Sequence, residues 1–174
     1  MNGIQHDAQD NVEDQPGEFY AQVILTVTDQ APLLGEPRLA RLTMDALASC
    51  TASAPGKLWG YVVLPDAVRL IVGPTNEESL ETFIALVKRH THTRLMEMIL
   101  RSDDDTVDVV LRYSPVWGGV NYQVWQVGEH RAIFWTEYKL SNALYELRQA
   151  PVTAGVASRS GEWPYCWVAG DDED

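Results

Sequence analysis

The chain has 174 residues, 45% of them hydrophobic, and a formal net charge of -12 at pH 7. These values suit one globular domain with a real core, or one domain with tails. They exclude a membrane-spanning helix, because no stretch approaches the roughly 18 consecutive apolar residues that one needs. The acidic start also lacks the apolar run of a secretory signal. The sequence therefore predicts a cytoplasmic protein with no membrane partner.

The negative charge is concentrated in three stretches that contain no Lys or Arg. They are residues 1–18, 103–108 and 171–174, with five, four and four acids of the 25 in the chain. The remainder, with 12 acids and 13 bases, is nearly neutral. We therefore expect acidic tails at 1–17 and 169–174 around one domain spanning 18–168. A neutral body is compatible with phosphate binding, but it lacks the basic stripe that would indicate such binding directly.

Hydrophobic periodicity predicts the elements of the domain. Residues 18–28, EFYAQVILTVT, are rich in β-branched and aromatic side chains and indicate a strand. A helix over 36–50 follows, and then two strands at 57–65 and 67–74 joined tightly at Pro65-Asp66. The next helix covers 76–100, with Asn76 or Thr75 as its cap.

The second half begins with an insert around 102–120, of which 106–118 has strand character. A strand or strand pair at 121–134 and a helix at 137–149, ended by Ala150-Pro151, complete the pattern. The aromatic end GEWPYCWV should pack back on the body. This order is the split βαβ arrangement of a ferredoxin-like α+β sandwich, an antiparallel sheet with helices on one face.

The two cysteines, Cys50 and Cys166, match no metal-binding or disulfide spacing. We interpret them as two buried free thiols in a reducing compartment.

Three blocks of the chain carry a pattern found in a known family. The first is WGYVVLPDAVRLIV (59–72), which is similar to the family stretch A-Y-V-V-M-P-N-H-V-H-L-L. The second is the helix segment LVKRHTHTRL (86–95). The third, residues 124–168, carries family positions in the family's order: Trp125-Gln126, Gly128, Leu140, Ala143-Leu144, Pro151-Val152, Ala154-Gly155 and Trp163-Pro164. In these blocks the chain resembles the REP-associated tyrosine transposases, which are HUH-type single-strand DNA transposases related to insertion-sequence transposases.

The resemblance implies a particular chemistry. Such enzymes cut and transfer single-stranded DNA beside a hairpin, using a tyrosine nucleophile that becomes linked to the phosphate. A Mg or Mn ion, held by two histidines two residues apart on a strand, polarises the phosphate. A further metal ligand lies four residues after the tyrosine on a helix.

The family's catalytic positions carry other residues in this chain. Ala67 and Arg69 stand where the histidine pair is expected, and a gapless alignment places Glu146 at the tyrosine and Ala150 at the helix ligand. Alanine has no donor atom and arginine repels a divalent ion, so no metal cofactor is expected. An alternative alignment shifted by one residue uses Tyr145 with Gln149, but it still lacks the histidine pair.

Several other side chains are candidates for contacts with nucleic acid. The basic ones predicted to face phosphate are Arg69, Lys88, Arg89, Arg94, Arg131 and Arg148, with Arg101 and Arg159 as further candidates; the alternative is a solvated charged face. The rings that could stack on bases, or else belong to the core, are Trp59, Trp117, Tyr122, Trp125 and Trp135. His90 and His92 point about 200° apart on a helix and are not expected to chelate. His130 is interpreted as a polar packing residue.

Three functions follow as hypotheses. The first is a catalytically degenerate transposase-like protein that binds hairpin or single-stranded DNA, with a homodimer left open. The second is an active tyrosine transposase that uses Tyr145 with an atypical metal site. The third is a protein-interaction module without nucleic acid, which would suit the acidic tails.

Overall fold

The structure is a computed structural model that describes residues 17–101, 115–116, 119–120 and 123–171. The predicted acidic tail before residue 17, most of the insert, Trp117, Tyr122 and the last three acids lie outside these residues. The described elements, in chain order, are β1 (Phe19–Thr26), η1 (Thr28–Gln30), η2 (Leu33–Gly35), α1 (Pro37–Thr51), β2 (Lys57–Val63), β3 (Ala67–Thr75), α2 (Glu77–Arg101), β4 (Pro115–Val116), β5 (Gly119–Val120), β6 (His130–Phe134), α4 (Glu137–Thr153) and β7 (Cys166–Val168).

One antiparallel sheet organises the domain. Its five strands lie in the order β6-β1-β3-β2-β7, and every neighbouring pair is antiparallel. The two-residue strands β4 and β5 pair separately. The predicted α+β fold with an antiparallel sheet is confirmed. No helix of the described part is long and apolar enough to cross a membrane.

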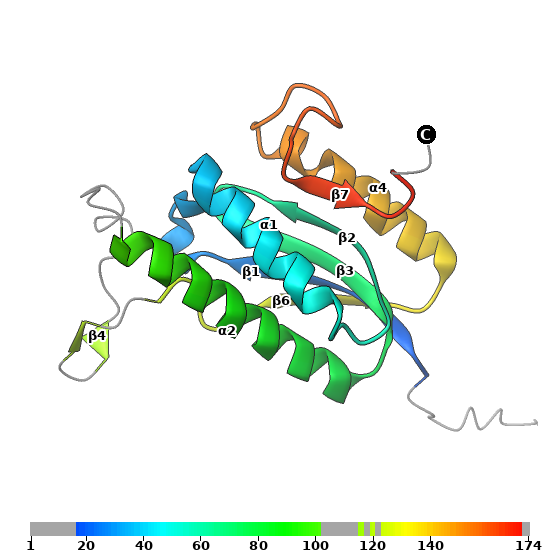
Figure 1. Cartoon of the computed structure of the whole chain (residues 1–174). Coiled ribbons are helices and arrows are strands. Elements are labelled where there is room, and N and C mark those ends of the chain that lie inside the picture. The colour runs from blue at the N-terminus through cyan, green and yellow to red at the C-terminus, as the bar shows by residue number, and fades with distance from the viewer. Residues whose placement is uncertain (1–16, 102–114, 117–118, 121–122, 172–174) are drawn as a thin grey trace, which may run out of the picture.

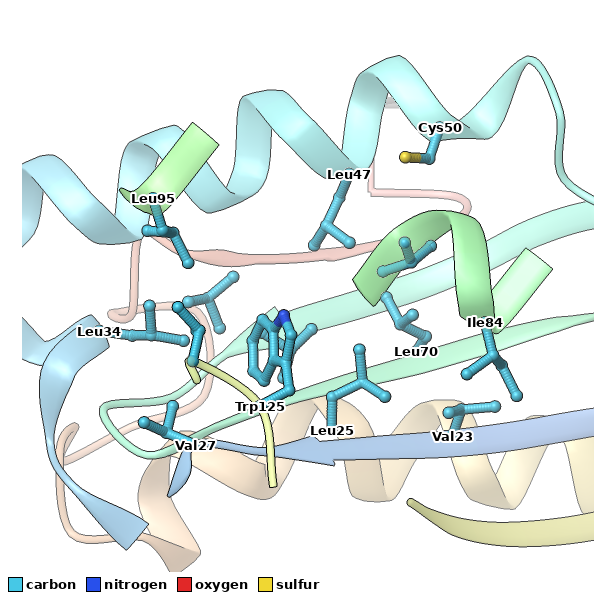
Figure 2. Packing of buried hydrophobic residues seen from close by; sticks show 14 of the residues in the cluster. Val23, Leu25, Val27, Leu34, Leu47, Cys50, Leu70, Ile84, Leu95 and Trp125 are labelled. Carbon is cyan, nitrogen blue, oxygen red and sulfur yellow. The ribbon is translucent and has the colours of Figure 1, made fainter. Parts of the chain in front are cut away.

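The helices cover both faces of the sheet, so the expectation of helices on one face is wrong for α4. On one face α1 and α2 pack over the larger core, which includes Leu25, Leu70 and Val87. On the other face α4 packs on a second cluster that includes Val62 and Ile71. Alternate residues of a strand point to opposite faces, which is why neighbours in β3 belong to different clusters. Figure 2 shows α1 above the strands and α4 below them.

Capping residues explain where the helices begin. Pro37 opens α1, and the Glu36 carboxylate accepts hydrogen bonds from the next two backbone N–H groups. The side chain of Asn76, one of the two predicted caps, accepts a bond from the Ser79 N–H at 3.0 Å. At the start of α4 the Thr136 hydroxyl accepts from the Lys139 N–H.

The last third of the chain differs from the prediction in two places and agrees with it in a third. Helix α4 continues through Pro151 to Thr153, because the missing proline N–H falls in the last turn and Ala154 N–H still reaches the Ala150 carbonyl. Of the predicted strand or strand pair at 121–134, the described residues 123–134 form the strand β6 and an isolated bridge between Trp125 and Val27. The aromatic end does pack back on the body, and it does so as strand β7 beside β2 (Figure 1).

A glycine lets α4 approach the sheet closely. Gly60 is in β2, and a Cβ atom there would lie 2.8 Å from Leu147 Cδ2 and 3.0 Å from the Trp167 carbonyl oxygen. Leu147 itself is fully buried. The contact between these two residues therefore sets how tightly α4 lies against the sheet.

Candidate nucleic-acid interface

Helix α4 covers only part of its face of the sheet. It contacts β2, β3 and β7. Tyr20 of β1 and Phe134 of β6 belong to the cluster under α4. The rest of β1 and β6 on that face lies beyond this cluster, and its side chains are half-buried or exposed. We call this surface the open half; it comprises Gln22, Ile24, Thr26, His130 and Ala132. It borders a hollow of about 280 Å³ lined by Thr26, His130 and residues 126–129.

Arg69 lies in the middle of the sheet on this same face. Its register partners are Ile24 on β1 and Val62 on β2. Arg69 therefore lies between the open half on one side and the part of the sheet that α4 covers on the other. The side chain is half-buried, and its Nε atom is buried without a hydrogen-bond partner. Within the described residues no carboxylate forms an ion pair with it. A buried donor without a partner is unfavourable, so this guanidinium is suited to an anionic ligand.

The residues at the expected metal position do not fit a divalent cation. Ala67 and Arg69 are two apart on β3 and share a face, as the resemblance requires. Ala67 is only 8% exposed and has no donor atom, while Arg69 brings a positive charge. Among the described residues no group of three His, Cys, Asp or Glu side chains could hold a metal ion.

Tyr145 points away from the sheet. The residues of α4 that pack on the sheet include Ala143 and Leu147, and Tyr145 lies two positions from each, about 200° around the helix. It is 65% exposed. In this arrangement its hydroxyl faces solvent on the far side of α4, while Ala150, at the family's helix ligand, is buried against the sheet.

Glu146 lies on the flank of α4 that faces the open half. Arg148 ion-pairs with Asp171, which also accepts from the Val168 N–H of β7, so the Arg148 flank faces β7. Glu146 is on the opposite flank, and β3 and β1 lie in that direction in the sheet. Gln149 is half-buried and Glu146 is exposed.

The six predicted phosphate contacts do not converge on one surface. Arg69 is on the α4 face, Arg148 is paired with Asp171, and the bases of α2 lie across the sheet. Lys88 and Arg131 are already neutralised by carboxylates. Lys88 Nζ lies 2.7 Å from Glu129, and Arg131 binds Glu129, Glu77 and Glu81. Arg89 and Arg94 are exposed and form no ion pair with a described residue.

Glu129 should make stability depend on pH. Its hydrogen bond from Lys88, followed by that from Arg131, lowers the pKa of the Glu129 carboxyl despite the opposing effect of burial. A lowered folded-state pKa stabilises the fold above the ordinary glutamate pKa, and that contribution is lost as the pH falls through the folded-state value. We predict that Glu129→Gln destabilises the protein at about pH 7 and that this difference shrinks toward about pH 3 in urea unfolding. A difference that stays constant over this range would contradict the prediction.

The aromatic and histidine candidates have separate environments. Trp125 is buried and donates through Nε1 to Thr91 at 2.8 Å, and Trp59 is half-buried and donates to the Gly73 carbonyl. Of the predicted stacking rings within the described residues, Trp135 alone is exposed, at 64%. His130 is exposed and so is not the packing residue that we expected.

The two helix histidines and the two thiols are less accessible. His90 and His92 are half-buried; the Nε2 atom of His90 is buried without a partner, and burial lowers the pKa of His92. Both cysteines are free, as predicted. Cys50 is buried, whereas Cys166 is half-buried and burial raises its pKa to about 11. Burial also raises the pKa of the Cys50 thiol, so neither cysteine is suited to act as a thiolate at neutral pH.

Sequence reasoning missed Gln22 and Thr26, the polar side chains of β1 on the open half. The signal was present, because β1 alternates strictly between buried and half-buried residues and both lie on the half-buried side. Glu129 was missed as well. Its two cationic partners occupy different elements, and one of them is 41 residues away in the chain.

Comparison with known proteins shows that the chain is similar to solved structures. No protein-family model and no curated protein sequence matches the chain. A solved structure of a REP-associated tyrosine transposase bound to a REP hairpin is similar, with a TM-score of 0.62, 12% identity, and coverage of 95% of this chain and 82% of that one. A candidate transposase from Deinococcus radiodurans R1 gives a TM-score of 0.49, 15% identity, and coverage of 84% and 95%. The first of these two likenesses, with its TM-score of 0.62, shows that the chain has a transposase-like fold.

Proposed function

We propose that this chain is a catalytically degenerate transposase-like protein that binds hairpin or single-stranded DNA on the open half of the sheet. The observation that carries the proposal is Arg69, a half-buried side chain at the centre of that face whose buried Nε atom has no hydrogen-bond partner among the described residues. The transposase of similar fold is bound to a REP hairpin, and this also favours DNA as the ligand.

A phosphate group would complete the hydrogen bonding of Arg69. The guanidinium can donate two parallel bonds to one phosphate, and such charge-assisted bonds are about twice as strong as neutral ones. In this role the protein's own positive charge replaces the charge that a metal ion brings in the family. Thr26, one strand away beside Ala67, and the exposed His130 provide further polar groups on the same surface.

The loss of strand transfer is supported by two placements. Ala67 and Arg69 do not fit a divalent ion, and the resemblance assigns that ion the task of polarising the phosphate. Tyr145 is the nearest tyrosine to the family position, yet it lies on the solvent side of α4. Neither the ion nor the nucleophile would then reach a phosphate bound at Arg69.

The test is a titration of a labelled DNA hairpin that carries a single-stranded extension, followed by fluorescence anisotropy. We expect binding at low salt that Arg69→Gln weakens by about ten- to a hundredfold, the worth of a hydrogen bond to a charged group. Arg69→Lys should recover only part of the loss, because an ammonium cannot bind bidentately. The matched control is Arg159→Gln. The structure does not bring this further candidate to the open half, because Arg159 pairs with Glu162 in the loop after α4, beside the Arg148 flank. Its side chain is 84% exposed, so the loss of its charge should change affinity less than about twofold.

Two results would contradict the proposal. DNA binding that is absent at low salt, or equally strong in Arg69→Gln, would contradict the proposal that the protein binds DNA at Arg69. Incubation of the wild-type protein with the hairpin and manganese tests the proposed loss of catalytic activity. A covalent protein–DNA adduct that Tyr145→Phe abolishes would identify an active transposase instead.

A further inference from the structure

The layer formed by α1 and α2 has a basic end. In α2 the first turns carry Glu77, Glu78 and Glu81, whereas from residue 88 to 101 the helix has four bases and a single acid, Glu97. The start of α1 adds Arg38 and Arg41, and this start lies beside the end of α2 (Figure 1). In a chain with a net charge of -12, this concentration of arginine is a local exception.

A groove runs between the two helices at this end. Its volume is about 420 Å³, and it is lined by Arg38, Leu42, Arg94, Glu97, Met98 and Arg101. Leu42 and Met98 pack against the core and form the apolar floor. Three guanidinium groups and one carboxylate therefore surround a hollow on the face of the sheet opposite Arg69.

The arginines of the groove are available to a ligand. Arg94 and Arg101 form no ion pair within the part of the chain that the structure describes. Among the described residues the ion-pair partner of Arg38 is Glu36, two residues before it, and both side chains are exposed. Exposed pairs of this kind are worth about 0–1 kcal/mol, so a phosphate can readily replace the carboxylate.

We infer that this groove binds the phosphodiester backbone of duplex DNA, independently of base sequence and of the open half. The inference rests on the proposed function in taking DNA as the ligand, but it assigns a second surface on the other side of the sheet. Such a surface would hold a double-stranded stem while unpaired DNA lies against Arg69.

The geometry favours an extended polyanion over a single phosphate. Arg94 and Arg101 are seven residues apart on one helix, about 10 Å along its axis, which is too far for one phosphate to reach both. Single-stranded DNA is usually held by aromatic side chains as well as by charge, and none of the six lining residues is aromatic. Guanidinium groups without stacking rings are typical of contacts with a duplex backbone.

The test is anisotropy with a labelled blunt duplex that has no loop and no single-stranded end, repeated at several salt concentrations. The double variant Arg94→Gln/Arg101→Gln should weaken binding and reduce the slope of log affinity against log salt by about two, one for each lost phosphate contact. Glu97→Gln should strengthen binding, since it removes the single acid from the groove. Glu78→Gln, which removes the same charge from the other end of α2, is the matched control and should change nothing. Because these side chains are at the surface, circular dichroism should show unchanged folding.

The outcomes separate this inference from the proposed function. Arg69→Gln should leave duplex binding unchanged while it weakens binding of single-stranded extensions. A wild-type protein that ignores the duplex at low salt, or a double variant that binds it with an unchanged salt slope, would overturn the groove assignment alone. A competition experiment gives a further outcome that would overturn the groove assignment. If a poly-glutamate peptide displaces the duplex at a lower concentration of charge than heparin does, the groove is suited to an acidic protein partner instead. If Arg69→Gln does not weaken the binding of single-stranded extensions, the proposed function is contradicted instead.

Discussion

Replacement of Trp125 by alanine is expected to lower the free energy of unfolding by about 3–5 kcal/mol, the usual cost of removing a buried large aromatic side chain. Trp125 is 4% exposed. Figure 2 shows its ring rising from the segment before β6 toward α1, and Trp125 belongs to the same core cluster as Leu25 and Leu34. It also joins that segment to α2, because its Nε1 donates to the buried Thr91 hydroxyl at 2.8 Å.

Urea unfolding followed by circular dichroism measures the effect and can divide it between packing and hydrogen bonding. Trp125→Phe keeps most of the ring but loses the donor, so it should cost about 1–3 kcal/mol. Thr91→Val removes the acceptor, and the double variant Trp125→Phe/Thr91→Val closes a mutant cycle whose coupling reports the bond itself. A Trp125→Ala protein as stable as the wild type would show that this contact does not hold the segment to α2.

The second large effect is expected at Leu147, where alanine should cost about 2–5 kcal/mol through the cavity it leaves. Leu147 is fully buried and packs in the cluster that joins α4 to the sheet. Its loss should loosen α4 over β2 and β3, next to Arg69. Weaker binding of single-stranded DNA should therefore accompany the lower stability.

Thermal and urea unfolding test this prediction, with Tyr145→Ala as the matched control two residues earlier on the same helix. Tyr145 is largely exposed, so its truncation should change stability by less than about 0.5 kcal/mol. If both substitutions lower the free energy of unfolding by the same amount, α4 is not held to the sheet by its Leu147 side.

Local patterns predicted the elements well but not the side of the sheet on which α4 packs. The alternation in β1 and the helical period of 77–101 depend on near neighbours in the chain and can be seen in the sequence. The apolar stripe of α4 shows that one side of the helix is buried, but it is equally compatible with either face of the sheet. Strand β7 has three residues, and it exists through pairing with β2 more than through its own pattern.

The candidate site was predictable only where it depends on spacing along one element. Ala67 and Arg69 share a face because they are two apart on a strand, and this was foreseen. Whether Arg69 and Arg94 act together was not foreseeable, since it depends on which face of the sheet each element occupies. The pairing of Lys88 with Glu129 likewise joins residues 41 positions apart.

The missing side chain at Gly60 has a consequence for comparing this chain with homologues. Since a Cβ atom would meet Leu147 Cδ2 at 2.8 Å, the two positions are expected to covary, with a smaller residue at 147 wherever 60 is not glycine. An alignment would then reveal the docking of α4 from a pair of columns 87 positions apart in this chain. A glycine conserved inside an otherwise regular strand would mark the place where a helix rests on the sheet, and not a turn.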